Sequence, residues 1–358
     1  MAKVITSGLM LAVMCLSGCS GPERFTAAGV TAAGSPDASG PPMTLWRIGG
    51  RAVEYLHDQN LPALESAEVW QSDYGPGLKL TTAHYEIFTT LLEPLMLRRV
   101  PLFMESAYSA YNGEMSEPIE TTTKFTVYLF ADRQQWTAFT KNFAGEQAEL
   151  YCAIKAGAYC HNGVCVAYNI GRKRTFSAIG HEGWHQFNSK HFKFRLPSWL
   201  DEGVAMLFES SRAEDGTFVF EPWEDTYRLD ALRRTLRKNE MMPLKELISI
   251  NPGEVLATNE SEAIMAFYGQ SYALVRFLRE GGCGKRPGTY RQLLLDGLKG
   301  DWPLDEVSKK IAEDRNQPRT ILWNRVVGQS LFHQYIGDDF EQVEQRYLAF
   351  CRQIIDQK

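Results

Sequence analysis

The sequence predicts an α+β fold in which a small mixed sheet is followed by a mostly helical C-terminal lobe. Three observations support this fold class. Apolar residues alternate in short runs before residue 171, as in β-strands. From Pro197 onward they recur at helical spacing. Between the two patterns stands His-Glu-Gly-Trp-His, residues 181–185, and we expect a functional site at this junction.

Residues 1–19 are predicted to be a targeting segment. Lys3 precedes a short apolar run, Val4 to Leu16, which is too short to span a bilayer and is typical of a signal peptide. Leu16-Ser17-Gly18-Cys19 resembles the bacterial lipobox, which implies cleavage before Cys19 and lipid on its thiol. Ser20 then implies the outer membrane, facing the periplasm or the exterior. An ordinary signal peptide with an incidental cysteine is the alternative.

Residues 20–43 are rich in Gly, Ala, Pro, Ser and Thr, which predicts a flexible tether spanning roughly 25–30 Å. The fold should begin near Leu45, and about 310 residues suffice for one large domain or two lobes. We expect a portion at 44–210 with the sheet and the motif, then a helical lobe at 211–358. The net charge of −5, with mixed signs, gives no basic surface for nucleic acid.

The first portion is expected to begin with helix. Residues 81–111 show helical spacing, broken into pieces by Pro94 and Pro101. Phe125–Phe130 alternates as a strand does. Asp132 can cap a following helix that ends at residue 143.

A hairpin is predicted next. Asn162-Gly163 is typical of a two-residue type I′ turn, which would place Cys160 opposite Cys165 at disulfide distance, although Cys152 could compete. The second strand should run through residues 166–170. Beyond the lipobox an odd number of cysteines leaves at least one free thiol; they are Cys152, Cys160, Cys165, Cys283 and Cys351.

The remaining elements are predicted helices. A basic turn at 172–174 leads into the motif helix, about Thr175 to Ser189. Apolar stripes then mark helices around residues 229–236, 264–278 and 340–350.

The motif at 181–185 predicts a metal site with its own base. Residues four apart share one helical face, so His181 and His185 can reach a single ion. Glu182 leans toward the same ion and can take a proton from water. The pentapeptide alone would occur by chance in about one such chain in a hundred, but its uncharged flanks suit a half-buried helix. Gly183 costs a helix about 1 kcal/mol against Ala, which predicts a close neighbour.

A catalytic zinc typically needs a third protein ligand, and the residues leave three candidates. His191 lies ten residues after His181, the metzincin offset, although that longer motif has Gly where this chain has Asn188. Asp201 and Glu202 follow in Pro-Ser-Trp-Leu-Asp-Glu-Gly-Val-Ala, residues 197–205. Asp201 could instead orient a ligand imidazole, as could Glu209 two turns beyond Glu202.

The two segments together are similar to those of gluzincin, or peptidase-MA-like, zinc metallopeptidases. In the aminopeptidase branch the second segment reads Trp-Leu-Asn-Glu-Gly-Phe-Ala, and its Glu, the third ligand, corresponds to Glu202. This chain differs at Asp201 and Val204, which removes no ligand. The resemblance covers about Thr175 to Glu209 and is nearest to uncharacterised secreted bacterial lipoproteins. It implies a zincin-like fold, with an edge hairpin over an active-site helix.

The resemblance also implies zinc-dependent hydrolysis of peptide bonds. His181, His185 and Glu202 would hold Zn²⁺, and Glu182 would move the proton. Gluzincins often stabilise the oxyanion with a Tyr or His from the later helices. Tyr268 is favoured over Tyr272, because it lies nearer the apolar stripe and follows Glu202 by an interval similar to that of the aminopeptidases.

The edge strand before the motif helix should bind an extended peptide or protein substrate. Residues 157–160 lack the acid that grips the free amine in aminopeptidases, which favours an endopeptidase. Two alternatives stay open. The chain could be a catalytically silent zincin acting as a membrane-anchored surface binding module, or a structural lipoprotein with a chance motif.

Overall fold

The computed structural model describes residues 43–155, 157–252, 261–280, 286–316, 320–337 and 339–356. The predicted signal peptide, the lipobox, the tether up to residue 42 and Cys283 lie outside these residues. Within the described part of the chain, no helix combines the length and the apolar character needed to cross a membrane.

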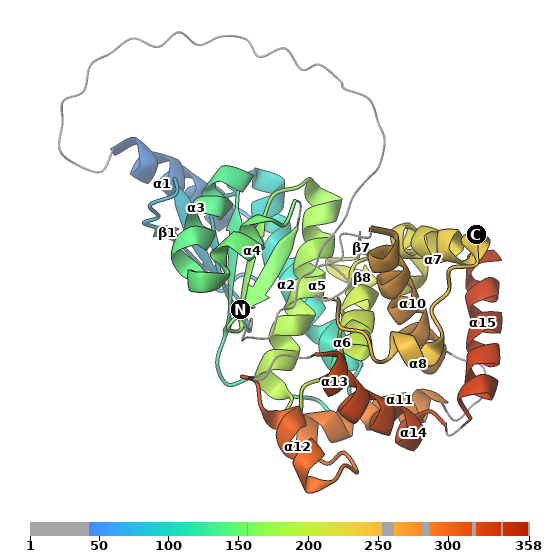
Figure 1. Ribbon diagram of the computed structural model, residues 1–358. Coiled ribbons are helices and arrows are strands. Elements are labelled where there is room, and N and C mark those ends of the chain that lie inside the picture. Colours follow the sequence, from blue (N-terminus) through green and yellow to red (C-terminus); the bar gives the residue numbers. More distant parts are fainter. Residues whose placement is uncertain are drawn as a thin grey trace.

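One six-stranded mixed sheet organises the first half of the chain (Figure 1). Its strands are β1 (Ser66–Trp70), β2 (Gly77–Thr81), β3 (Tyr85–Thr89), β4 (Phe125–Phe130), β5 (Ala158–His161) and β6 (Val164–Tyr168). The spatial order is β1-β2-β3-β4-β6-β5. β3, β4 and β6 pair in parallel and the other pairs are antiparallel. The expected mixed sheet is confirmed, and β5 forms one of its edges.

Helices cover both faces of this sheet, because its strands bury side chains on both sides. The helices of this half are α1 (Met43–His57), α2 (Pro94–Gly113), α3 (Arg133–Phe143), η1 (Gly145–Gln147), α4 (Ala148–Cys152) and α5 (Arg172–His191). Val127 of β4 and Ala167 of β6 belong to the large core shared with α2 and α5. Val166 and Tyr168, of opposite parity, belong to the smaller core with α3 and α4. The motif helix α5 therefore lies against one face of the sheet.

Three expectations for this half need correction. Residues 85–89 form strand β3 rather than helix, because Tyr85, Ile87 and Thr89 are buried alternately while they pair in parallel with β4. Pro94 begins α2 instead of breaking it, as suits a position whose N–H has no helical partner. α2 also continues through Pro101. The expected cap is confirmed, since Asp132 accepts a hydrogen bond from the Gln135 N–H at 2.9 Å.

The second half is mainly helical, as expected. Its elements are α6 (Ser198–Ala205), η2 (Met206–Phe208), η3 (Pro222–Glu224), α7 (Thr226–Lys238), α8 (Leu244–Leu247), α10 (Ser261–Glu280), α11 (Arg286–Lys299), α12 (Glu306–Glu313), α13 (Ile321–Trp323), η4 (Asn324–Gly328), α14 (Gln329–Tyr335) and α15 (Phe340–Asp356). A two-stranded hairpin, β7 (Ser211–Glu214) and β8 (Thr217–Phe220), was not expected. Its Asp215-Gly216 turn has positive φ at both residues, and that dipeptide was the available signal.

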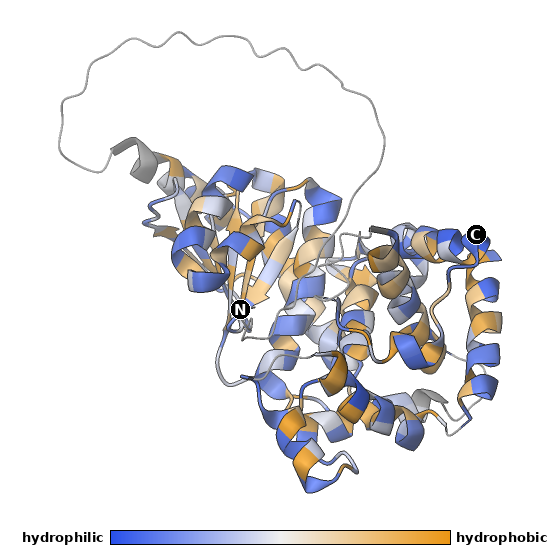
Figure 2. Cartoon of the chain, in the orientation of Figure 1, coloured by the Kyte–Doolittle hydropathy of each residue, from blue (hydrophilic) through white to orange (hydrophobic). Residues whose placement is uncertain are grey.

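The two halves meet at α5 and α6, which lie between the sheet and the later helices (Figure 1). α6 packs against both α5 and α10. Hydrophobic residues (orange) are frequent in the strands of the sheet, and hydrophilic residues (blue) are frequent along the outer helices (Figure 2). His181, Glu182 and His185 are each at most 2% exposed, so the motif is buried where the two halves meet.

Candidate metal centre

The motif helix α5 is longer and more buried than the sequence indicated. It begins at Arg172, so the basic residues expected in a turn form its first turn. Thr175 to Asn188 is buried almost throughout. Gln186 fixes the helix to the sheet, since its side-chain NH₂ donates to the carbonyls of Thr126 and Gly163 at 2.7 Å each. These bonds hold the motif beside the hairpin turn.

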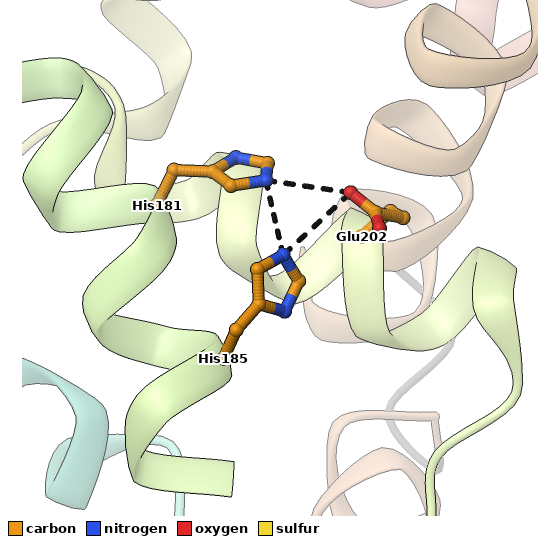
Figure 3. A group of neighbouring side chains, drawn as sticks. All are labelled: His181, His185 and Glu202. Atoms are coloured by element: carbon orange, nitrogen blue, oxygen red, sulfur yellow. Dashed lines mark hydrogen bonds and ion pairs between the residues drawn. The ribbon is translucent and has the colours of Figure 1, made fainter. Parts of the chain in front are cut away.

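Three side chains predicted from the sequence converge on one point (Figure 3). His181 and His185 project from α5, and Glu202 projects from α6. The two Nε2 atoms lie 3.1 Å apart, and Glu202 Oε2 lies 3.3 Å from one and 3.7 Å from the other. Each side chain is at most 2% exposed. This buried His-His-Glu group can hold a metal ion.

Two further carboxylates orient the imidazoles. His181 Nδ1 lies 2.7 Å from Glu209 Oε1, and His185 Nδ1 lies 3.1 Å from Asp201 Oδ1. An ionised carboxylate can only accept hydrogen bonds, so each Nδ1 carries the proton. With an ion bound, each Nε2 would present its lone pair to that ion, the arrangement that metal-ligating histidines adopt. The roles considered for Asp201 and Glu209 agree with these contacts.

Asp201 is itself held by the motif helix. Its Oδ1 accepts hydrogen bonds from Trp184 Nε1 at 3.2 Å and Asn188 Nδ2 at 2.9 Å, in addition to the contact with His185. Asn188 occupies the place at which the metzincin motif has Gly. Its side-chain amide donates to Asp201 and so holds the carboxylate that contacts His185. The sequence alone did not suggest this role.

Glu209 is fixed by Arg228, which sequence reasoning missed. Arg228 Nε and Nη2 donate to Glu209 Oε2 and Oε1 at 2.8 and 2.6 Å, and both residues are buried. Arg228 belongs to α7 and its guanidinium lies 5.1 Å from the centre of the Tyr268 ring. No local pattern links residues 209 and 228, so only the tertiary fold reveals this pair.

The pKa values of the group reflect burial opposed by close charges. Burial lowers the pKa of His181, but its hydrogen bonds to Glu202 and Glu209 outweigh this and raise it to about 9. Burial raises the pKa of Glu202, but His185 and His181 outweigh it and hold the value well below the usual range. The carboxylate thus stays ionised beside imidazoles that attract protons. A cation is the natural partner for this set of donors.

Glu182 differs from the other carboxylates of the site, because both of its oxygens are buried and neither makes a hydrogen bond of ordinary geometry within the described part of the chain, although the backbone N–H of Cys160 acts on the carboxyl. Burial raises its pKa to about 7, against the opposing effect of His185 and His181. A buried polar group without a partner is costly, and such groups often mark a catalytic role. The side chain is therefore available to a molecule that enters the site.

Glu202 reaches the imidazoles because α6 approaches α10 very closely at the next residue. A Cβ on Gly203 would lie 2.7 Å from the carbonyl oxygen of Ser271 and closer still to Val275. Real Cβ atoms essentially never come within 3.0 Å. Only glycine permits this approach, which presses α6 against α10 and sets the position of Glu202.

Tyr268 and Tyr272 have different surroundings. The pKa of Tyr268 is raised well above its ordinary value, first by burial and then by Glu202, and its ring lies beside Arg228, which holds Glu209. The Tyr272 hydroxyl donates to the carbonyl of Pro222 at 2.5 Å and accepts from Arg276. The structure thus commits Tyr272 to a contact outside the site.

His191 lies outside the His-His-Glu group. It ends α5, its Nε2 lies 2.9 Å from the Thr121 hydroxyl, and its ring packs against Phe125 and Phe187. Burial and then Lys190 lower its pKa to about 4. The helix carries His191 away from the His181–His185 face, because ten residues do not return to the same side at 3.6 residues per turn.

The predicted hairpin is present, but the predicted disulfide is not. Asn162 and Gly163 both have positive φ, and Cys160 pairs with Cys165 across the strands. Both thiols are nevertheless free, as is Cys152. Correct cross-strand register therefore did not suffice for a bond.

A cavity of about 370 Å³ adjoins the centre. His185 and Asp201 line its inner end, and the hairpin residues 160–163 line one side. A molecule in this cavity would reach the site alongside the edge strand. Comparison of the chain with protein-family models, with curated proteins and with solved structures gives no significant match.

Proposed function

We propose that this protein is a zinc-dependent peptidase of the gluzincin type, anchored in the bacterial envelope by lipid on Cys19, and an endopeptidase rather than an aminopeptidase. The observation that carries the proposal is the unpartnered, buried carboxylate of Glu182 beside a group that can hold a metal. A structural metal site is closed by its ligands and has no use for such a carboxylate.

The spacing of the donors supports zinc. Tetrahedral zinc with bonds of about 2.0–2.2 Å places its ligand atoms roughly 3.3–3.6 Å apart. The donor atoms of His181, His185 and Glu202 are separated by 3.1, 3.3 and 3.7 Å. Two imidazoles and one carboxylate also match the ligand set of catalytic zinc, which leaves a position for water.

The chain's own residues then divide the chemistry. Zinc bound here would lower the pKa of water and polarise a carbonyl. Glu182 would accept the proton of the attacking water and deliver it to the leaving amine. Tyr268 would donate a hydrogen bond to the developing oxyanion. β5 is an edge strand with no outer neighbour among the described strands, so a peptide could pair with its main chain.

The test compares wild type with Glu182→Gln. Zinc content is measured by plasma emission, and cleavage is measured on a proteome-derived peptide library. We expect equal zinc, about one ion per chain, and cleavage by the wild type alone, abolished by a chelator. Zinc without cleavage of any peptide would instead support the silent binding module.

A second pair of variants separates the two tyrosines. Tyr268→Phe should lower kcat at least about tenfold while zinc content is kept, because it removes one donor to the oxyanion. Tyr272→Phe is the matched control, since its hydroxyl is bound to Pro222, and its kcat should stay near that of the wild type. Equal turnover in both variants would exclude the role of Tyr268.

A further inference from the structure

The cavity beside the metal centre carries an unexpected charge for an acidic protein. The chain has a net charge of −5, yet two arginines, Arg195 and Arg315, line this cavity. Asp201 is the only acidic side chain among the described lining residues, and its Oδ1 already accepts from Trp184 and Asn188. The remaining polar lining, which includes Asn162, consists of uncharged groups apart from histidine. The cavity is therefore suited to an anion.

The two guanidinium groups are held by the backbone. Arg195 is 6% exposed, and its Nη1 donates to the carbonyl of Asp314 at 2.9 Å. Its guanidinium carbon lies 5.7 Å from the centre of the Trp323 ring. Arg315 is exposed, and its Nη2 donates to the carbonyl of Phe192. These bonds hold both guanidinium groups, each with five N–H donors, at the wall of the cavity.

The position of the cavity relates this charge to the reacting bond. The same cavity is lined by the ligand His185 and by Cys160 of edge strand β5. A peptide extended along β5 would project alternate side chains toward this wall. Carboxylates are the peptide groups that guanidinium binds best, with two parallel hydrogen bonds.

We propose that this cavity is a substrate subsite that binds a carboxylate of the peptide through Arg195 and Arg315. The carboxylate is either an acidic side chain at a fixed distance from the cleaved bond or the C-terminal carboxylate of a short substrate. The inference rests on the proposed peptidase function and adds the substrate class to it.

The first test is cleavage of a proteome-derived peptide library by the wild type and by Arg315→Gln, with product ends identified by mass spectrometry. The wild type should favour Asp or Glu at one position, or cleave at a fixed distance from the C-terminus. Arg315→Gln should lose that preference and about tenfold in kcat/KM on the favoured peptides. Arg237→Gln, an exposed arginine of α7 outside the cavity, is the matched control and should keep both.

A second variant guards against misfolding. Arg315 is exposed, so its substitution should leave the fold intact, whereas Arg195 is buried and is replaced conservatively, as Arg195→Lys. Lysine keeps the charge but not the planar pair of donors, so the same preference should weaken. Cleavage by the wild type without any acidic or C-terminal preference would overturn the subsite and leave the peptidase proposal standing.

A binding measurement keeps the two proposals distinguishable if no peptide is cleaved. Zinc-loaded Glu182→Gln is titrated with fluorescent peptides that are identical except for Glu against Gln, or a free against an amidated C-terminus. Tighter binding of the Glu peptide identifies a side-chain subsite, and tighter binding of the free acid identifies a terminal one. Equal affinity in all four peptides would overturn the inference.

Discussion

Gly183 allows the packing of the motif helix to be tested directly. A Cβ there would lie well inside 3.0 Å of the Tyr111 hydroxyl oxygen and 3.2 Å from its ring carbon Cζ. That hydroxyl donates to the Gly180 carbonyl at 2.7 Å, and the Tyr111 ring is fully buried beside Trp184, Phe187 and Phe208. The ring cannot retreat, so Gly183→Ala must push α5 away from α2 by about 1 Å.

The expected magnitude follows from two opposing effects. Overpacking a rigid core of this kind costs about 2–3 kcal/mol. Replacing glycine by alanine within a helix returns about 1 kcal/mol. Gly183→Ala should therefore lower the free energy of unfolding by about 1–2 kcal/mol, which corresponds to a fall in Tm of roughly 2–4 °C for a chain of this size.

Thermal unfolding of four proteins tests the reasoning: wild type, Gly183→Ala, Tyr111→Phe and the double variant. Tyr111→Phe alone should cost about 1 kcal/mol for the lost hydrogen bond. In its background the alanine meets no hydroxyl but still meets the ring carbon Cζ at 3.2 Å, so part of the overpacking is relieved and the double variant should be more stable than the sum of the single changes by about 1–2 kcal/mol. Gly113→Ala, where nothing lies within 4 Å, is the control on α2. Additive effects, or a Gly183→Ala protein as stable as the wild type, would refute the close-packing argument.

Three further predictions concern the surroundings of the centre. Glu209→Gln should weaken zinc binding about 10–100-fold, measured by competition with a chelating dye, because His181 loses its ionised partner. Burial and then Glu209 raise the pKa of Asp225 to about 7. The folded protein therefore keeps a proton that the unfolded chain releases near pH 4. The free energy of unfolding thus falls as the pH rises from about 4 to about 7. Asp225→Asn should therefore raise the free energy of unfolding at pH 8 by up to about 4 kcal/mol, and raise Tm with it, but change both little at pH 4. A higher Tm at both pH values would contradict this explanation. Alkylation of the unfolded protein without reductant should label both Cys160 and Cys165, and a protected pair would show that they form a disulfide.

The parts of the structure that the sequence predicted well depend on short-range chemistry. The 3.6-residue repeat places His181 and His185 on one face, Asp132 caps the helix that follows it, and Asn162-Gly163 makes the hairpin turn. Strand β3 failed for the opposite reason. Apolar residues spaced by four around residues 87–95 fit a helix, and it is pairing with β2 on one side and with β4, some 40 residues away, on the other that makes residues 85–89 a strand. Arg228 likewise meets Glu209 through tertiary packing alone.

The site also shows why one short segment controls the whole centre. Asp201, Glu202 and Glu209 lie within nine residues of chain, and they supply the carboxylate of the His-His-Glu group together with both carboxylates that orient the two imidazoles. Any shift of α6 relative to α5 would therefore move the Glu202 carboxylate and turn both imidazoles at once. Two independent anchors oppose such a shift: the close approach at Gly203 presses α6 onto α10, and Arg228 holds Glu209 from α7. The helical second half of the chain thus fixes the geometry of donors that arise in the first half, and a metal site of this kind requires both.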